Sequence, residues 1–443
     1  MISEKEAVMK KIVGLLLVLT LAVGITAALS AESYAYAKST KKTDASTVTG
    51  KAMKITKKTK ATTEEMISGY NGFALKALRT TIKNEKAGTN VMISPASLMF
   101  AIDMCAMGAK GKTYSQMASL VKKGATKRDL LKFAKYYRTS LESSGVMDIA
   151  NSIWINESNP ALGSSKINEG YLNLLRKYFK AAAATRKFDD TVKDEINAWI
   201  SDKTKGMIPK TLDVLEQSTL MLIINAMAFE GKWNLEYEDY QINEDGKFTN
   251  YAGEEEKAKM LSSEESLYFE TAAEKGFLKY YEGRKYAFMA ILPNDKDISV
   301  NDYVAALPDN AFETFYDSLG YVDVVNAKIP AFSFDYSIIM NNNLKKLGMK
   351  KAFDPDADFS LMLSEPTNAS IYIGRVIHKT HIELDEKGTK AAAVTVIDVK
   401  GEGCAPEPEL EIKEVILDRP FVFAIVDTET GTPVFVGVVN TVK

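Results

Sequence analysis

The chain has 443 residues, of which 46% are hydrophobic, and its formal net charge at pH 7 is -2. This composition is typical of a globular protein with a large core, and the small net charge excludes a general electrostatic attraction to nucleic acid. The length is compatible with two or three domains or with one large domain built on a sheet.

The first forty residues have the pattern of an export signal. Lys10 and Lys11 precede an uncharged apolar run over residues 12–28, and an A-x-A motif ends at Ala37. Together these features predict a secretory signal peptide over residues 1–37. The alternative is a transmembrane anchor, for which an apolar run of about 17 residues is marginal in length. We therefore expect a secreted, extracellular protein that is not held in a membrane after signal removal.

The ordered part of the chain is expected to begin after a polar linker. Residues 38–62 are rich in Lys, Thr, Ser and Ala without apolar periodicity, which is typical of a flexible segment. Thr62 and Glu65 then have the spacing of a capping box, which predicts the start of the first helix. A second helix is predicted to start after Ser94, with proline in its first turn, and to run to Gly108.

Strand patterns dominate the second half of the chain. Residues 220–229 are almost wholly apolar, as expected of a strand that is buried on both faces, and residues 286–292 are similar. Two apolar runs, 421–426 and 434–439, flank a turn-rich stretch and predict a C-terminal hairpin. The sequence thus predicts a mixed α+β fold around a large sheet.

The reactive residues argue against catalysis. The chain has two histidines, His378 and His381, and no pattern of a zinc site, a nucleophile elbow or a phosphate-binding loop. His378 lies in a strand-like run, residues 372–378, where a structural role is the simplest explanation. Cys105 is expected to be buried and Cys404 to lie in an exposed loop, with no disulfide between them. We therefore expect no enzyme, no metal and no cofactor.

One segment, residues 386–406, combines a strand pattern with the flanks of a loop. Gly388 offers a hinge, and the residues that follow alternate between an uncharged face and a charged face. The uncharged face contains Thr389, Ala391, Ala393, Thr395, Ile397 and Val399. Gly401, Gly403 and Pro406 then indicate a loop. The segment is either a conformational switch or an ordinary central strand followed by a surface turn.

Motifs spread over most of the chain resemble the serpin family of protease inhibitors, from about residue 63 to 442. The strongest is Ile224-Asn225-Ala-Met-Ala-Phe-Glu-Gly231-Lys-Trp233, which is similar to a central strand of that family. The other motifs, in family order, lie at residues 90–97, 108–113, 150–155, 196–208, 329–332 with 344–349, 357–360, 378–379, 386–393 and 418–421. Each is weak alone, but their common order is specific.

The resemblance implies a single serpin domain over residues 63–443, with a large central mixed sheet, additional sheets, about eight to nine helices and an exposed reactive-centre loop at residues 386–418. It also implies an irreversible suicide-substrate inhibitor of serine proteases that acts as a monomer. The protease would cleave the loop, form an acyl-enzyme and be trapped as the loop inserts into the main sheet, which is a known case of strand addition. The alternative is a non-inhibitory serpin with a binding or scaffolding role.

The resemblance also implies roles for single residues. The hinge would consist of Glu386, Gly388, Thr389, Ala391, Ala392 and Ala393. A cluster that re-pairs when the sheet opens would contain Ser94, Ser97, Asn225 and His378, with Trp233 as an aromatic plate at the top of the gap. Two residues depart from the family pattern: Val394 is bulky for the hinge, and Thr441 replaces a proline.

The resemblance also implies a position for the reactive bond, because inhibitory serpins are cut at a nearly fixed distance from the hinge. Counting from Glu386 places the bond at Glu402-Gly403, which would suit a glutamyl-specific protease. The stretch that follows is longer than usual, so four other residues stay open as cleavage positions: Val399, Lys400, Cys404 and Ala405. Of these, Lys400 would suit a trypsin-like protease, and the other three would suit elastase-like or subtilisin-like proteases.

Overall fold

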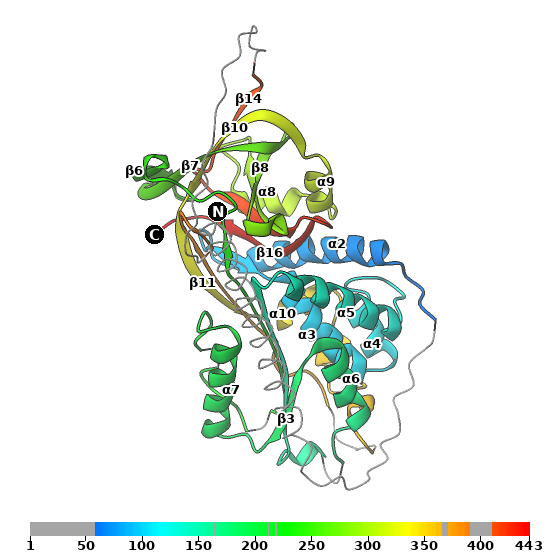
Figure 1. The fold of residues 1–443 in the computed structure, drawn as a ribbon. Helices are drawn as coiled ribbons and strands as arrows, with labels where there is room; N and C mark the ends of the chain where they lie inside the picture. The colour runs from blue at the N-terminus through cyan, green and yellow to red at the C-terminus, as the bar shows by residue number, and fades with distance from the viewer. Residues whose placement is uncertain (1–57, 163–164, 211, 218, 366–370, 390–409) are drawn as a thin grey trace, which may run out of the picture. The chain divides into compact units, whose positions relative to one another are not determined.

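The computed structural model describes residues 58–162, 165–210, 212–217, 219–365, 371–389 and 410–443, with the backbone alone at residues 161, 183 and 225. The predicted signal peptide and most of the predicted linker lie outside these ranges. Within them no helix is long and apolar enough to cross a membrane. The described residues form nine α-helices (Figure 1): α2 (Thr63–Ile82), α3 (Pro95–Gly108), α4 (Gly111–Ala118), α5 (Lys127–Ser143), α6 (Glu169–Phe179), α7 (Asp190–Lys203), α8 (Val300–Ala306), α9 (Ala311–Asp317) and α10 (Asn341–Lys346).

The largest hydrogen-bonded sheet has nine strands and is mixed, because β10 and β14 run parallel while the other pairs are antiparallel. In sheet order the strands are β1 (Val91–Ile93), β16 (Thr432–Val439), β15 (Phe421–Asp427), β9 (Tyr286–Pro293), β8 (Glu274–Tyr280), β7 (Glu255–Glu270), β10 (Gly320–Pro330) and β14 (Ile412–Ile416), with β6 (Ile242–Thr249) paired to β7. The predicted C-terminal hairpin is confirmed as β15 and β16.

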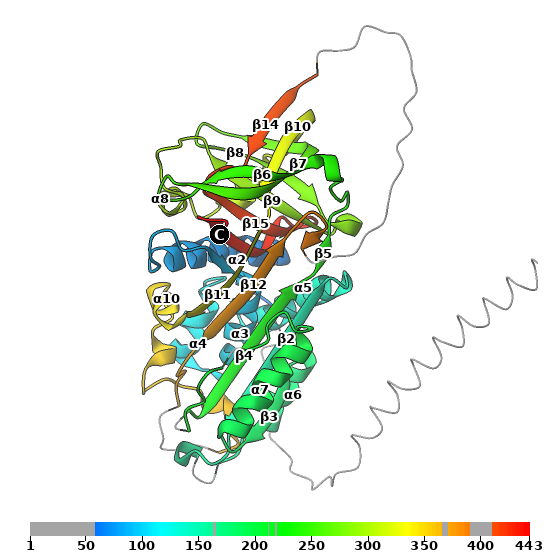
Figure 2. The ribbon, with the colours of Figure 1, turned by 90° about the vertical axis from the view of Figure 1, so that its left-hand side faces the viewer.

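Five further strands lie side by side below this sheet (Figure 2). Two hydrogen-bonded groups make them up: β11 (Phe332–Ile339) with β12 (Ile377–Leu384), and β3 (Ala182–Arg186), β2 (Met147–Asn156) and β4 (Met221–Phe229) in that order. A short pair, β5 (Gly231–Lys232) and β13 (Gly388–Thr389), lies at the upper end of β4 and β12. The predicted α+β fold with one large mixed sheet and smaller sheets is thus confirmed.

Local sequence explains where the first helices begin. Thr62 and Glu65 form the predicted capping box at the start of α2, in which each side chain accepts the other residue's backbone N–H. Ser94 caps α3 through a bond from the Ser97 N–H to its Oγ, and Pro95 occupies the first turn, where its missing N–H costs nothing. Every residue of α3 is buried, so this helix is held by packing on all sides.

Strand β4 separates two hydrophobic cores. Leu222, Ile224 and Ala226 pack in a cluster with α7, whereas Met227 and Phe229 belong to the main core on the opposite face. Alternate residues of a strand point to opposite faces. Met221, Ile223, Met227 and Phe229 accordingly lie on the face of β4 towards α3, and the even-numbered residues lie on the face towards α7. The prediction of a strand buried on both faces is confirmed.

Two predictions from local pattern need correction. The strand-like run 372–378 becomes a strand only at Ile377. The Asn341 side chain donates to the Gly374 carbonyl (2.6 Å) and accepts from the Val376 N–H (2.8 Å), so these backbone groups are not free to pair with a neighbouring strand. The last residues of the predicted linker are also fixed, since the Lys60 N–H donates to the Asp129 carboxylate at 2.9 Å.

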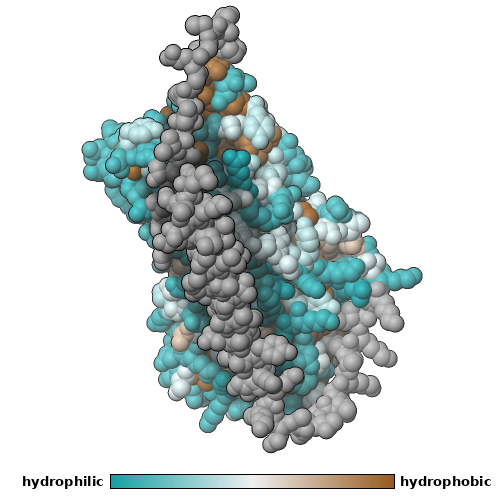
Figure 3. Space-filling view, viewed as in Figure 1, coloured by the Kyte–Doolittle hydropathy of each residue, from teal (hydrophilic) through white to brown (hydrophobic). Residues whose placement is uncertain are grey.

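One end of the nine-stranded sheet exposes apolar side chains. Most of the face seen in Figure 3 is hydrophilic, with apolar residues gathered where β10 and β14 lie. Leu410, two residues before β14, and Ile412, its first residue, are 54% and 58% exposed. In this sheet β14 is an edge strand, and only Leu410 and Glu411 separate it from residues 390–409, which lie outside the described ranges.

Candidate functional site

A tight turn reverses the chain at the end of β12 and directs it towards β5. Asp385 and Gly388 form a bridge across this turn, and β13 then pairs antiparallel with β5, Gly388 opposite Lys232 and Thr389 opposite Gly231. Gly388 has a φ of +143°, and a Cβ there would lie 2.3 Å from the Gly231 carbonyl oxygen. Both the backbone conformation and the close approach require glycine.

Three hydrogen bonds hold the carbonyl groups of this turn. The Trp233 N–H donates to the Lys387 carbonyl at 3.0 Å, and the Trp233 indole N–H donates to the Asp385 carbonyl at 2.9 Å. The Tyr237 N–H donates to the Glu386 carbonyl at 3.1 Å. The turn is therefore fixed through its backbone by the chain that follows β5.

A fourth contact uses a side chain of the turn. The Glu386 carboxylate lies 2.7 Å from the Lys259 ammonium of β7. The hydrogen bond from Lys259 lowers the pKa of Glu386. Because both side chains are about a quarter exposed, this ion pair contributes at most about 1 kcal/mol to stability.

The first residue after the glycine is buried against aromatic rings. Thr389 is 4% exposed, and its Oγ1 lies 2.9 Å from the hydroxyl oxygen of Tyr281. Tyr281 stacks on Trp233 with ring centroids 4.5 Å apart and an interplanar angle of 11°. Trp233 thus contacts the turn through its indole N–H and supports Thr389 through Tyr281.

A buried lysine underlies these rings. Lys279 of β8 is 3% exposed, and its ammonium lies 2.9 Å from Glu265 of β7. The same ammonium lies 4.4 Å from the ring centroid of Tyr237 and 5.4 Å from that of Trp233. A cation over an aromatic face is attracted to it, more strongly when both are desolvated. Lys279 therefore helps to hold the two residues that bind the turn, and no local sequence pattern indicated it.

The turn stands at the common end of two neighbouring strands. β12 ends at the turn, and the turn reverses the chain into β13, which is antiparallel to β5. Because β5 continues the direction of β4, strands β4 and β12 run parallel and end at the turn. They lie side by side (Figure 2). Among the described residues β4 is laddered to β2 and β12 to β11, and no ladder joins β4 to β12. The facing edges can therefore accept a strand that descends from the turn, antiparallel to both.

A polar cluster joins β12 to the start of α3. The Ser94 N–H donates to His378 Nε2 at 3.0 Å, and Ser94 Oγ donates to the Val434 carbonyl at 3.0 Å. His378 is 1% exposed, and burial lowers its pKa to about 4. The ring is therefore neutral above this pH, with its proton on Nδ1 because Nε2 accepts a hydrogen bond.

The structure brings the predicted residues together as two groups. Glu386, Gly388, Thr389 and Trp233 meet at the turn, whereas Ser94, Ser97 and His378 meet beneath the strands. Asn225 is described only by its backbone, which pairs with Asn151 across β4 and β2. The remaining predicted residues lie outside the described ranges: Ala391, Ala392, Ala393, Val399, Lys400, Glu402, Gly403, Cys404 and Ala405.

Little in the described residues resembles a reaction centre. His378 is occupied by Ser94, and His381 lies on the opposite face of β12, 3.1 Å from Asp335 at the surface. Cys105 is buried as expected, with a free thiol whose pKa is raised above the usual range by burial. Across the described ranges no cluster of three or more His, Cys, Asp or Glu residues could hold a metal ion.

Comparison with known families identifies the fold. The sequence model described as Serpin (serine protease inhibitor) matches residues 68–442. The chain belongs to the serpin family. Serpins are protease inhibitors rather than enzymes, so this protein is non-catalytic.

Curated serpins match over most of their length. Serpin-Z10 of Arabidopsis thaliana is 27% identical over 391 residues, which cover 84% of this chain and 96% of that protein. An uncharacterized serpin-like protein of Methanosarcina acetivorans is 27% identical over 390 residues, covering 85% of this chain and 88% of that protein.

Solved serpin structures show the same fold. The thermophilic serpin tengpin in its native state is 36% identical and aligns with a TM-score of 0.77, covering 87% of this chain and 96% of tengpin. Tengpin in its latent state gives 0.73 at 34% identity, with 87% and 100% of the two chains covered.

Proposed function

We propose that this serpin is an irreversible suicide-substrate inhibitor of serine proteases that is secreted and acts as a monomer. In this proposal a protease attacks the loop that follows the turn and forms an acyl-enzyme. The cut loop then enters the gap between β4 and β12 as a new strand. The observation that carries the proposal is the pair of unladdered, parallel strand edges that end at the Gly388 turn.

The energy for trapping would come from strand addition. About a dozen new backbone hydrogen bonds at about 1 kcal/mol each give a driving force on the order of 10 kcal/mol, before the burial of side chains. Displacement of catalytic groups by about 1 Å is enough to stop deacylation. Thr389 is already paired with Gly231, and the small residues Ala391 and Ala393 would enter next, where a large or charged side chain would clash or carry a desolvation cost.

The target would be set by the residue before the cut bond. We place this bond at Glu402-Gly403, with a glutamyl-specific protease as target. Cleavage after Val399, Cys404 or Ala405 would instead indicate an elastase-like or subtilisin-like enzyme. Cleavage after Lys400 would indicate a trypsin-like enzyme. Residues 1–37, which have the pattern of a signal peptide, support secretion. A secreted inhibitor would encounter extracellular proteases of these classes.

The test is incubation with glutamyl-specific, elastase-like, subtilisin-like and trypsin-like proteases, followed by denaturing gels and mass spectrometry of the released C-terminal peptide. We expect an SDS-stable covalent complex with at least one protease, and the peptide mass fixes the bond. Cleavage within residues 399–405 by all of them, with no complex and no rise in melting temperature of the cleaved protein, would contradict the proposal and favour a non-inhibitory serpin.

A further inference from the structure

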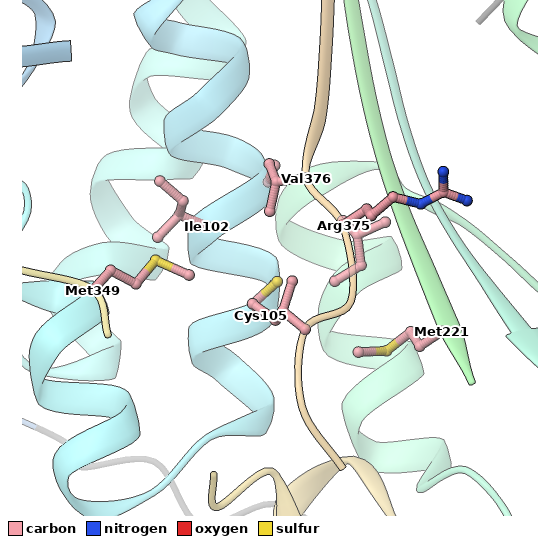
Figure 4. Close-up of a pocket in the computed structure, with 9 residues that line it drawn as sticks. Ile102, Cys105, Met221, Met349, Arg375 and Val376 are labelled. Carbon is pink, nitrogen blue, oxygen red and sulfur yellow. The ribbon is translucent and has the colours of Figure 1, made fainter. Parts of the chain in front are cut away.

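A pocket beneath β4 and a pocket beside the end of β16 differ in their chemistry. The first is apolar and is lined by residues of α3, β4 and the segment before β12 (Figure 4). Its one charged side chain, Arg375, extends away from Cys105 and lies 3.6 Å from the Glu216 carboxylate. Among its described side chains this pocket therefore offers no unpaired charge that would select a ligand.

The second pocket is polar and is formed where five segments meet. They lie at residues 87–88 after α2, 249–253 between β6 and β7, 293–301 between β9 and α8, 418–420 before β15, and at Asn440 after β16. The space between them is about 1140 Å³, part of which is open to solvent. Sites for small molecules usually enclose about 300–1,000 Å³, so this pocket has room for such a ligand.

Backbone hydrogen bonds fix the walls of this polar pocket. The Thr249 N–H donates to the Asp418 carbonyl at 2.7 Å, and the Tyr251 N–H donates to the Asn440 carbonyl at 3.0 Å. The Tyr251 ring covers Gly88, where a Cβ would lie 2.1 Å from a ring carbon. Tyr251 is nevertheless 54% exposed and lines the pocket, so it offers a positioned aromatic surface to a ligand.

A guanidinium in the wall has no carboxylate partner. Arg419 Nη2 donates to the Pro293 carbonyl at 2.7 Å, and no ion pair joins Arg419 to a carboxylate in the described ranges. Burial lowers the pKa of Arg419, and the charge of Asp418 offsets only part of this effect. The side chain stays charged at neutral pH, so its remaining N–H groups are donors for a ligand.

Two amide oxygens that line the pocket lack donors. Asn301 Oδ1 is buried and has no hydrogen-bond partner among the described residues. Asn440 is 3% exposed, and its Nδ2 donates to the Thr89 carbonyl at 2.8 Å, whereas no described donor bonds its Oδ1. Buried polar groups are normally paired, because leaving one unpaired is destabilising. These oxygens therefore point to a molecule that donates hydrogen bonds.

This combination of groups restricts the chemistry of the ligand. The lining contains three carboxylates, Asp295, Asp297 and Asp418, against two cations, Lys296 and Arg419, so it does not favour an anion. Arg419 requires an acceptor and the two asparagine oxygens require donors, and a hydroxyl group serves as both. An aromatic ring such as that of Tyr251 packs against an apolar face. A pyranose sugar has several hydroxyl groups around an apolar ring face.

We propose that this pocket binds a neutral sugar, with Arg419, Asn301 and Asn440 bonding its hydroxyl groups and Tyr251 packing against its ring. The site is separate from the proposed inhibitory mechanism, since none of its lining residues belongs to the Gly388 turn, β4 or β12. A polysaccharide that presents such sugars would hold the protein at a surface.

The first experiment is isothermal titration calorimetry of the protein with glucose, galactose, mannose and N-acetylglucosamine. Glucuronate and glucosamine are titrated in parallel, because they add a negative or a positive charge to the same ring. We expect at least one neutral sugar to bind at a single site and neither charged sugar to bind more tightly.

The second experiment locates the site with variants. Asn301→Ala removes an oxygen that has no partner in the free protein, so it should weaken sugar binding about fivefold without lowering the melting temperature. Tyr251→Ala should also weaken binding, because the aromatic surface is lost. Tyr321→Ala, the matched control at an 82% exposed tyrosine of β10, should leave binding unchanged.

Four outcomes would overturn the proposal. Tighter binding of glucuronate than of any neutral sugar would indicate an anion site at Arg419, and tighter binding of glucosamine would indicate a cation site at the carboxylates. Binding of none of these sugars would show that the pocket holds only water. Sugar binding that is unchanged in both Asn301→Ala and Tyr251→Ala would place the site elsewhere on the protein.

Discussion

The hydroxyl groups of Thr389 and Tyr281 lie 2.9 Å apart, and both side chains are buried. This contact ties the first residue after the Gly388 turn to the aromatic stack of Tyr281 and Trp233. Any strand that enters between β4 and β12 must start from this point. The size and charge of residue 389 therefore bear directly on the proposed mechanism.

Thr389→Arg should convert the protein from an inhibitor into a substrate. A guanidinium at this buried site would lack a partner and cost several kcal/mol, enough to slow insertion by ~100-fold or more. The measurement is the yield of SDS-stable complex against the yield of cleaved chain. Thr389→Ser, which keeps the hydroxyl, is the control and should still form complex. Complex formation by Thr389→Arg at the wild-type level would refute the insertion step.

Lys279→Met should destabilise the protein by about 3 kcal/mol, because it leaves the Glu265 carboxylate, whose side chain is only 13% exposed, without a cation and with the Ser263 hydroxyl as its remaining donor. Adding Glu265→Gln should recover much of this loss, since the unpaired charge is then removed. Urea unfolding followed by tryptophan fluorescence checks both variants. Lys259→Met, which breaks the exposed pair with Glu386, is the comparison and should cost less than about 1 kcal/mol. Equal losses for the two lysines would show that Lys279 has no special role.

Stability should fall as the pH drops from 6.5 to about 4, and His378 should account for part of that fall. Burial lowers the pKa of this histidine from 6.5 to about 4. Between these values the unfolded chain binds a proton that the folded chain excludes, so the stabilisation present above pH 6.5 is lost on acidification. The loss is on the order of 3 kcal/mol.

The check is urea unfolding across this pH range. His378→Gln should lower stability at pH 7 and flatten the pH profile. A His378→Gln profile as steep as that of wild type would contradict the assignment.

Asp103→Ala should stabilise the protein at pH 7 by about 1–3 kcal/mol. Asp103 lies within α3, is 2% exposed, and its Oδ2 has no hydrogen-bond partner among the described residues. Burial raises its pKa well above 3.8. The carboxyl therefore favours the fold in acid and loses that contribution as the pH rises, so the gain from Asp103→Ala should shrink as the pH falls towards 4.

Asp129 is as buried as Asp103, at 2% exposure, but its pKa is shifted in the opposite direction. Burial raises its pKa, but hydrogen bonds from Thr126 and Lys60 outweigh this and lower it overall. It stabilises the fold above its unfolded pKa and loses that contribution in acid. Asp129→Asn should therefore destabilise at pH 7, and thermal melts of both variants between pH 4 and 7 compare them. Destabilisation by Asp103→Ala at pH 7 would show that Asp103 has a partner.

Much of the fold follows from local sequence. The capping box at Thr62, the proline-started helix after Ser94 and the C-terminal hairpin were all predictable, because each depends on residues close together in the chain. The coil before Ile377 was not, since bonds from the distant Asn341 compete with strand formation there.

The candidate site was also only partly predictable from the sequence. Gly388 stands out in the sequence as a hinge, and its φ and close approach to Gly231 give the physical reason. The placement of Trp233 and His378 came from the family resemblance. Lys279 and Glu265 escaped notice because they belong to different strands, and only the folded sheet brings their charges together beneath the rings.

The hydrogen bonds that hold the turn leave the sequence of the following loop free to vary. Three of its hydrogen bonds end on the carbonyl oxygens of Asp385, Glu386 and Lys387, and all three donors come from Trp233 and Tyr237. Every amino acid has a backbone carbonyl, so these three hydrogen bonds do not depend on which side chains residues 385–387 carry. Bait sequences beyond Thr389 can therefore be exchanged, in evolution or by grafting, while the anchorage stays as it is.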